Sequence, residues 1–125
     1  MGHSYRDLVV WQKGKALSVA AYRITDSFPK SEIYGLTSQI RRAAVSVVSN
    51  IAEGQGRLTK GEFLQFLGHA RGSLFELDTQ LEIAVELNYL KAEDHQIISD
   101  NIAEVRRLLL GLIDSLHGKS KGASA

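Results

Sequence analysis

The residues of this chain that could act as acids, bases or metal ligands match no catalytic or metal-binding pattern in their spacing. The four histidines, His3, His69, His95 and His117, are scattered along the sequence. A di-iron site in a helix bundle requires Glu-x-x-His on facing helices, and only Asp114 with His117 comes near that spacing. The chain contains no cysteine, which excludes thiolate chemistry and zinc–thiolate sites. The sequence therefore predicts no metal and no cofactor.

Nucleotide-binding and hydrolase motifs are also missing from the sequence. Gly54-Gln55-Gly56 is not followed by the Lys-Ser/Thr pair of a phosphate-binding loop, and no G-x-S-x-G occurs. Glu53 and Glu76 remain as a carboxylate pair on consecutive predicted helices. We interpret them, with the nearby Asn50 and Ser73, as polar residues that fix the register between helices or subunits, and acid–base catalysis is the less favoured alternative. The sequence predicts a protein that is not an enzyme and has no small-molecule substrate.

Residues 37–56 are expected to form the central helix of the fold. At 100° per residue, its apolar side chains fill a sector of roughly 200°, whereas a helix with one buried face needs about 100°. Val45 and Ala52 form the surplus strip, beside Arg41. Either this helix is buried between two neighbours of its own bundle, or the surplus strip contacts another subunit. Gly54 and Gly56 are expected to end the helix through a left-handed cap.

The following segment predicts a long helix that begins after Thr59 and reaches Asn88. Thr59 and Glu62 have the spacing of a capping box, in which each side chain accepts a hydrogen bond from the other residue's backbone N–H. Gly68 and Gly72 lie in the middle of this helix, where each costs about 1 kcal/mol relative to alanine. We therefore expect another backbone to pass close by, with the counterpart formed by the small residues Ala43, Ala44 and Ser46 of the preceding helix.

Leu64 and Phe75 lie on a sector of the same helix that is otherwise charged and points away from its core stripe. Such an acidic strip is either a solvated face or, because of these two apolar residues, a partner surface.

Two further helices complete the pattern, from about Leu8 to Ser27 and from about Ala92 to Leu116. Pro29 ends the first, and a heptad-like apolar seam defines the last. Thr37 is expected to cap the central helix. Four long helices with short connections predict an all-α fold, an elongated, antiparallel up-down-up-down four-helix bundle. Residues 1–117 are expected to form this single domain and residues 118–125 a disordered basic tail.

No apolar run approaches the roughly 18 residues of a membrane span, and the first residues do not resemble a signal peptide. We therefore expect a cytoplasmic protein with no membrane partner.

One long run resembles a family signature: SQIRRAAVSVVSNIAEGQGR, at residues 38–57. It is similar to that of the bacterial S23, or 23S rRNA intervening-sequence, proteins. Four further pieces agree in order: DLVVWQK (7–13), FPKSE-YGL (28–36), EFLQFLGHARGSLFEL (62–77) and RRLLLGLIDSL (106–116). The resemblance covers about residues 5–116. The sequence departs from the family's pattern at Val48, where proline is expected, and at Gly14, where alanine is expected.

The resemblance implies a four-helix-bundle fold and a homo-oligomer, typically a pentamer. Some members of the family are encoded within intervening sequences of large-subunit rRNA genes. A related branch serves as the accessory protein of diversity-generating retroelements, which binds nucleic acid and a reverse transcriptase. The partners implied for this chain are therefore further copies of itself, RNA or DNA, and a reverse transcriptase.

The charge is distributed unevenly along a chain whose net charge is only +1. Residues 1–60 hold nine basic and four acidic groups, and residues 61–125 hold six basic and ten acidic groups. This asymmetry permits an anionic partner or head-to-tail self-association. The candidate nucleic-acid-binding residues are Arg41, Arg42, Arg57, Lys60, Arg71 and Lys13. Trp11, Tyr22 and Tyr34 form no evident stacking row among them.

Two functional hypotheses follow. The first is a non-catalytic, homo-oligomeric protein that associates with RNA or DNA as an accessory protein. The alternative is an oligomeric scaffold or protein-interaction module that does not bind nucleic acid. The predicted subunit contacts are Val45, Ala52, Leu64 and Phe75. The two hypotheses compete for the same arginines, because residues buried between subunits cannot also bind phosphate.

Overall fold

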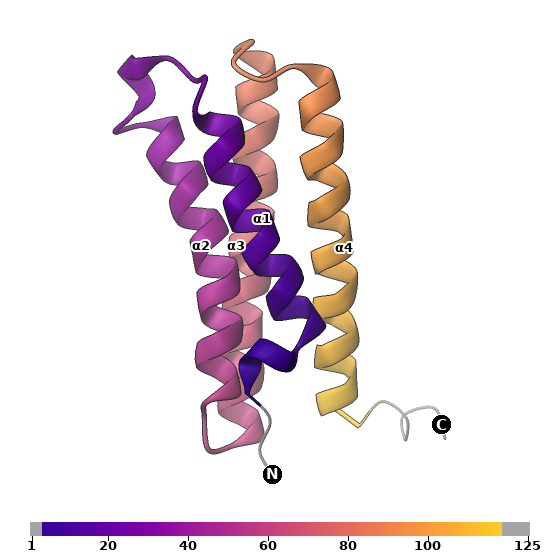
Figure 1. Cartoon of the computed structure of the whole chain (residues 1–125). Helices are drawn as coiled ribbons and strands as arrows, with labels where there is room; N and C mark the ends of the chain where they lie inside the picture. The colour runs from indigo at the N-terminus through magenta and orange to yellow at the C-terminus, as the bar shows by residue number, and fades with distance from the viewer. Residues whose placement is uncertain (1–3, 119–125) are drawn as a thin grey trace.

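The computed structural model describes residues 4–118, in which four long helices and two short 3-10 helices occur without any strand (Figure 1). The long helices are α1 (Val9–Thr25), α2 (Leu36–Gln55), α3 (Lys60–Glu86) and α4 (Ala92–Leu116), and the short ones are η1 (Tyr5–Asp7) and η2 (Lys30–Glu32). This confirms the predicted all-α, four-helix fold. Residues 119–125 of the predicted basic tail lie outside the described residues.

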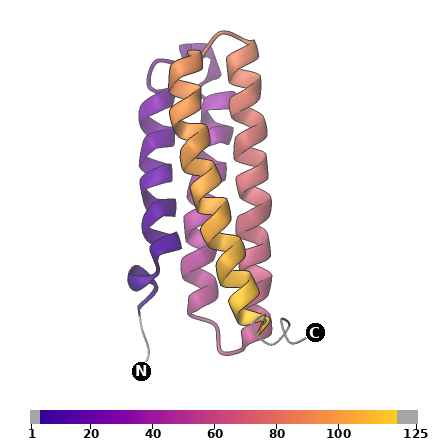
Figure 2. The ribbon, with the colours of Figure 1, turned by 90° about the vertical axis from the view of Figure 1, so that its right-hand side faces the viewer.

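Successive helices run in opposite directions, and the quarter turn of Figure 2 shows the same alternation. The helices pack in a ring, α1 on α2, α2 on α3, α3 on α4 and α4 back on α1. The side formed by α1 and α2 therefore lies opposite the side formed by α3 and α4. We call the end that contains η1, the α2–α3 turn and the last turn of α4 the lower end, as in Figure 1. The upper end contains η2 and the α3–α4 turn.

The core is a stripe of apolar side chains from all four helices. The largest fully buried members are Leu17, Ile40, Val47, Ile51, Leu67, Leu74, Leu77, Leu81, Ile98, Val105 and Leu109. Fully burying one such side chain stabilises a fold by about 1.5–3 kcal/mol. The spacing of three and four residues that predicted these stripes is therefore also what holds the bundle together.

Gly54 allows α2 to pack tightly on α3 near the lower end. It is buried inside α2, and a Cβ atom there would lie 2.8 Å from Phe66 Cβ and 2.9 Å from Phe63 Cδ1. The predicted left-handed glycine cap is wrong, because α2 continues past Gly54 and ends at Gly56 with φ −83° and ψ 0°, a right-handed conformation. Gly54 is needed for the space that it leaves, not for its backbone conformation.

The mid-helix glycines of α3 have a different setting from the one expected. A Cβ atom at Gly68 or Gly72 would meet nothing within 4 Å, and both residues are exposed. The expected close approach to Ala43, Ala44 and Ser46 is therefore wrong within one chain, because the two glycines lie on the outer face of α3. A tighter approach occurs at Gly14, whose Cβ would lie 3.4 Å from Val48 Cβ. The two positions that depart from the family's pattern thus face each other.

The helix ends partly follow the prediction. Thr59 caps α3, its hydroxyl oxygen accepting from the Glu62 N–H at 3.1 Å. Thr37 does not cap α2: it is buried within the first turn, and the Leu36 N–H donates instead to Glu32 Oε1 at 2.9 Å. The sequence predicted that the Thr37 hydroxyl caps α2. In the structure the turn at Gly35 brings the Glu32 carboxylate to the N-terminus of α2 instead.

We expect Gly54→Ala to lower the free energy of unfolding by about 1–3 kcal/mol, because the added methyl group overpacks the contact with Phe63 and Phe66. Gly111→Ala is the matched control: its Cβ would meet nothing within 4 Å, so the better helix propensity should raise stability by about 1 kcal/mol. Urea unfolding followed by circular dichroism measures both. Equal midpoints for the two variants would contradict the packing argument.

Candidate functional site

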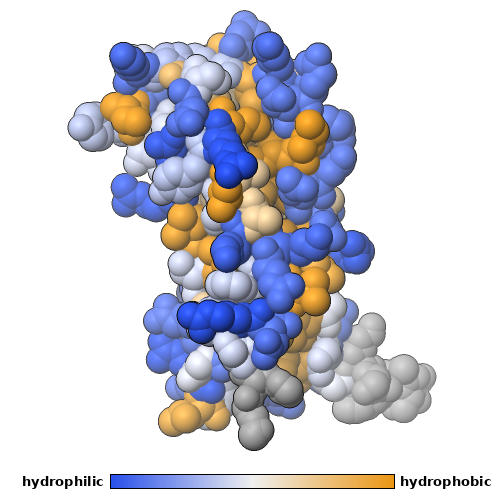
Figure 3. Space-filling model, viewed as in Figure 1, coloured by the Kyte–Doolittle hydropathy of each residue, from blue (hydrophilic) through white to orange (hydrophobic). Residues whose placement is uncertain are grey.

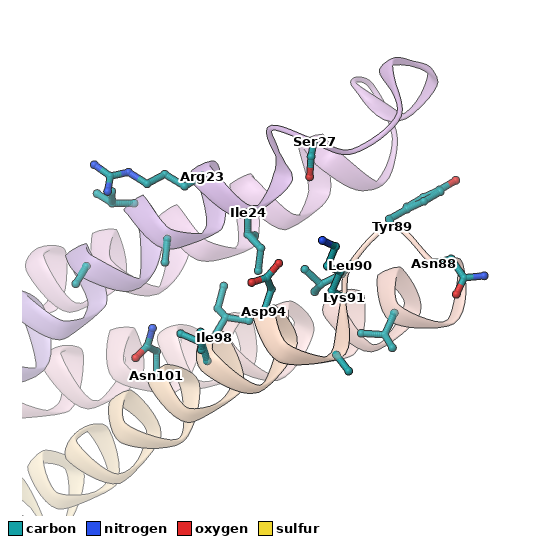
Figure 4. Close-up of a pocket in the computed structure, with 16 residues that line it drawn as sticks. Arg23, Ile24, Ser27, Asn88, Tyr89, Leu90, Lys91, Asp94, Ile98 and Asn101 are labelled. Atoms are coloured by element: carbon teal, nitrogen blue, oxygen red, sulfur yellow. The ribbon is translucent and has the colours of Figure 1, made fainter.

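A groove lies between α1 and α4 near the upper end, with a volume of about 1170 Å³ (Figure 4). Ala16 and Ala20 line its α1 side, and their small side chains leave the space open. Asp94 and Asn101 extend from α4 toward α1, whereas Tyr89 points away. None of the lining residues is a histidine. The groove offers an apolar surface with a few polar groups.

A polar contact joins α2 to α3 in the middle of the bundle. The hydroxyl oxygens of Ser46 and Ser73 lie 2.8 Å apart. Asn50 Nδ2 donates to the Ser46 carbonyl oxygen at 2.8 Å and to Ser46 Oγ at 3.0 Å. The structure thus links two of the predicted polar residues, Asn50 and Ser73, through Ser46. All three are half-buried, where a satisfied hydrogen bond favours one register between the helices.

Glu53 and Glu76 bond to residues four positions further along the chain. Arg57 Nη2, in the turn after α2, lies 3.1 Å from Glu53 Oε2, and Gln80 Nε2 of α3 donates to Glu76 Oε2 at 3.4 Å. Both carboxylates are in exposed residues. These are polar contacts at the surface.

Two of the six predicted nucleic-acid-binding residues contact a neighbouring helix. Arg41 Nε donates to Thr25 Oγ1 at 2.8 Å, its Nη2 lies 3.4 Å from Asp26 Oδ1, and its side chain is 22% exposed. Lys13 Nζ lies 3.6 Å from Glu104 Oε2, in an ion pair between α1 and α4 in which the lysine side chain is 48% exposed. Arg41 therefore contributes to packing between helices, whereas the ion pair of Lys13 lies at the surface and stabilises by only about 0–1 kcal/mol.

The other predicted cations are exposed but do not form one cluster. Sixteen residues separate Arg41 from Arg57 along α2 and its turn, roughly 24 Å at 1.5 Å per residue. Arg41 and Arg42 therefore lie toward the upper end, while Arg57 and Lys60 lie at the lower end. Arg71 lies on α3, with its guanidinium 5.5 Å from the centre of the Phe75 ring.

Sequence reasoning missed that several cations lie over aromatic rings. Five cation–π pairs occur in the described chain: Arg6–Tyr5, Lys15–Trp11, Arg41–Tyr22, Arg57–Phe66 and Arg71–Phe75. Proteins contain about one such pair per 70–80 residues, so this chain of 125 residues is enriched in them. The spacing of four residues in Lys15–Trp11 and Arg71–Phe75 was a usable signal. The Arg41 and Arg57 pairs join different helices and required the tertiary structure.

Two further arginines were not selected from the sequence. Arg106 and Arg107 line a cavity of about 580 Å³ between α3 and α4, together with Arg71 and Phe75. Their adjacent positions in the sequence, next to the apolar seam of α4, could have identified them as a basic site.

The four predicted subunit contacts are only partly covered in the single chain. Val45 is 39% and Phe75 45% exposed, while Ala52 and Leu64 are half-buried. Val45 lines a cavity of about 550 Å³ between α1 and α2, whereas Phe75 lines the cavity between α3 and α4. Surplus apolar surface therefore occurs on two opposite sides of the bundle.

Glu32 joins the two connections of the upper end. Its Oε1 accepts from the Leu36 N–H and its Oε2 from the Tyr89 hydroxyl, each at 2.9 Å. The bond from the Leu36 N–H, followed by that from Tyr89, lowers the pKa of the Glu32 carboxyl below its usual value. The same contact with Glu32 raises the pKa of Tyr89. Both shifts arise because the bonds favour the carboxylate and the protonated phenol.

Within residues 4–118, no three His, Cys, Asp or Glu side chains lie close enough together to hold a metal ion. None of the helices in that range is both long and apolar enough to span a membrane.

Residues 6–111 match the family described as 23S rRNA-intervening sequence protein. The chain belongs to this family. A crystal structure of a protein with unknown function from the S23 ribosomal protein family of Bacteroides thetaiotaomicron matches it with a TM-score of 0.76 at 23% identity, covering 84% of this chain and 98% of that chain. At this identity the likeness shows the fold alone. No curated protein matches the chain.

In this member of the 23S rRNA-intervening sequence protein family, we expect Glu32 to make stability depend on pH in the acidic range. A carboxyl whose pKa is lowered by folding stabilises the fold above its unfolded pKa of about 4.3, and this contribution is lost as pH falls through the lower, folded pKa. Urea unfolding from pH 6 to pH 3 should therefore show a smaller loss of stability in Glu32→Gln than in wild type. Tyr89→Phe should retain part of the dependence, because the Leu36 N–H still donates. Parallel curves for wild type and Glu32→Gln would contradict this assignment.

Proposed function

We propose that this chain is a non-catalytic protein that assembles into a homo-oligomer and associates with RNA or DNA as an accessory protein. The observation that carries the assembly is the pair of half-exposed apolar side chains on opposite sides of the bundle, Val45 between α1 and α2 and Phe75 between α3 and α4. A contact between two different sides is heterologous, and it repeats from copy to copy until the ring closes.

Charge complementarity supports the same contact. Residues 1–60, which contain α1 and α2, hold nine basic and four acidic groups. Residues 61–125, which contain α4 and all but the first residue of α3, hold six basic and ten acidic groups. The ring of helices puts these two parts on opposite sides, so their overall charges favour the contact, although Arg71, Arg106 and Arg107 line the cavity beside Phe75. Five copies is the number that the family resemblance implies. Gly68 and Gly72 on the outer face of α3 leave room for such a neighbour.

Association with RNA rests on two supports. The family's description links its members to the intervening sequences of 23S rRNA. The exposed cations Arg42, Arg57 and Lys60 provide groups that can contact phosphates. A reverse transcriptase as a partner follows only from the resemblance.

The second candidate function is a scaffold that binds proteins and no nucleic acid. The contacts of Arg41 with Thr25 and Asp26 favour it, because this half-buried cation is then less available to phosphates.

Light scattering coupled to size-exclusion chromatography tests the assembly. We expect wild type to have a mass about five times the 13.8 kDa of the chain, and Val45→Glu to reduce it to 13.8 kDa, since burying a carboxylate in place of this apolar side chain carries a desolvation cost. Val19→Glu is the matched control: this valine is 43% exposed but borders the α1–α4 groove, so its variant should assemble as wild type does. A wild-type mass of 13.8 kDa would exclude the proposed oligomer.

A titration of wild type against RNA at increasing salt tests the association. We expect binding at about 50 mM salt that weakens on a log–log plot by about 0.7 for each phosphate contacted on a single strand. Absence of binding at low salt would exclude the RNA association and leave the scaffold function.

A further inference from the structure

We propose that single-stranded RNA binds at the lower end of the bundle, where aromatic rings and cationic side chains alternate. This inference rests on the proposed association with nucleic acid and adds where the strand lies and which kind of strand is bound.

The first part of this surface is formed by η1 and the start of α1. The rings of Tyr5 and Trp11 lie 5.2 Å apart at 59° to each other, and both residues are half-buried. The guanidinium of Arg6 lies 4.8 Å from the centre of the Tyr5 ring, and Lys15 Nζ lies 5.5 Å from the centre of the Trp11 ring. Two aromatic faces and two exposed cations therefore occur within one short segment.

The second part is the turn between α2 and α3. Arg57 lies over Phe66, at 4.4 Å from the ring centre, and the exposed Lys60 follows in the first turn of α3. Leu58, between these cations, is 97% exposed. The ion pair of Arg57 with Glu53 is solvent-exposed, at 40% and 57%. Such a pair stabilises by only about 0–1 kcal/mol, so a phosphate can replace the carboxylate.

The two parts lie at the same end of the molecule. The short helix η1 packs against both α1 and α2, next to the last turns of α2 (Figure 1). In Figure 3 hydrophilic side chains cover much of this face, including its lower front. At the lower end the cations Arg6, Lys15, Arg57 and Lys60 match in number the acids Asp7, Glu53, Glu62 and Asp114. At the upper end the acids Glu82, Glu86, Glu93 and Asp94 lie around the α3–α4 turn, where Lys91 is the nearest cation in the sequence. A polyanion is therefore opposed less at the lower end than at the α3–α4 turn.

This combination fits a single strand better than a duplex. Proteins that bind single strands stack unpaired bases on aromatic rings and track the phosphates with cations. Stacked bases within a duplex are not available to Tyr5 or Trp11. The proposed contact between the α1–α2 and α3–α4 sides leaves the lower end uncovered. In a ring whose axis follows the bundles, each copy presents this end on the same rim.

Fluorescence provides the test with the full chain, because Trp11 is its only tryptophan. The probe is a short, mixed-sequence single-stranded RNA, compared with the same sequence as a duplex. We expect the single strand to quench Trp11 fluorescence and to bind more tightly than the duplex. Equal binding of both forms without quenching would overturn the stacking contact.

Two matched triple variants test the location. Arg6→Ala/Arg57→Ala/Lys60→Ala removes three positive charges from the lower end, and the loss of three phosphate contacts should reduce the log–log salt slope by about 2. Arg23→Ala/Lys30→Ala/Lys91→Ala removes the same charge from the upper half and should leave the slope as in wild type. Tyr5→Leu keeps an apolar side chain without the aromatic face. It should weaken binding about fivefold or more, as expected for one lost base–aromatic stack.

The outcomes distinguish the association with RNA from its location at the lower end. Failure of wild type to bind either RNA at low salt would remove the proposed function itself. If wild type binds RNA but the two triple variants weaken binding equally, the proposed location is wrong and the association with RNA stands. The same conclusion follows if the lower-end variant binds as wild type does. Circular dichroism and light scattering of each variant distinguish lost contacts from lost folding or assembly.

Discussion

The close contact of α2 with α3 at Gly54 is the constraint on which the rest of the structure depends. Phe63 and Phe66 occupy the space in which any other residue at position 54 would place its Cβ atom. The short turn after α2 can therefore return directly, and the Ser46–Ser73 hydrogen bond fixes the register further along. The same packing puts Phe66 under Arg57, so the lower-end surface is a consequence of how these two helices meet.

The outer helices close the ring under weaker constraints. α1 packs against α2 through Gly14, but beside α4 its small side chains Ala16 and Ala20 line a groove of about 1170 Å³. At the upper end, Glu32 joins η2 to the α3–α4 turn by accepting from both Leu36 and Tyr89. The closest packing is thus between α2 and α3, and at the upper end the Glu32 carboxylate joins the α1–α2 and α3–α4 connections.

The cations differ in how firmly they are held. Arg41 is half-buried and bonds to Thr25 of the neighbouring helix while lying over the Tyr22 ring. Arg6, Lys15, Arg57 and Arg71 are exposed and lie over aromatic rings, where the charged group remains hydrated. A count of basic residues does not separate these two settings. In the proposed assembly, the sides of the bundle contact further copies and the lower end is left for RNA.

The sequence by itself determined the helices, their apolar stripes, the Thr59 cap and the family, because each depends on residues a few positions apart. The sequence also suggested Asn50 and Ser73 as polar residues between helices, and the structure connects them through Ser46. Only the tertiary structure decided which glycine is needed for packing: Gly54 and not Gly68 or Gly72. It also decided that Glu32, and not Thr37, meets the start of α2. These outcomes depend on which faces of distant segments meet, and helical periodicity leaves that open because it fixes the direction of a side chain and not its neighbour.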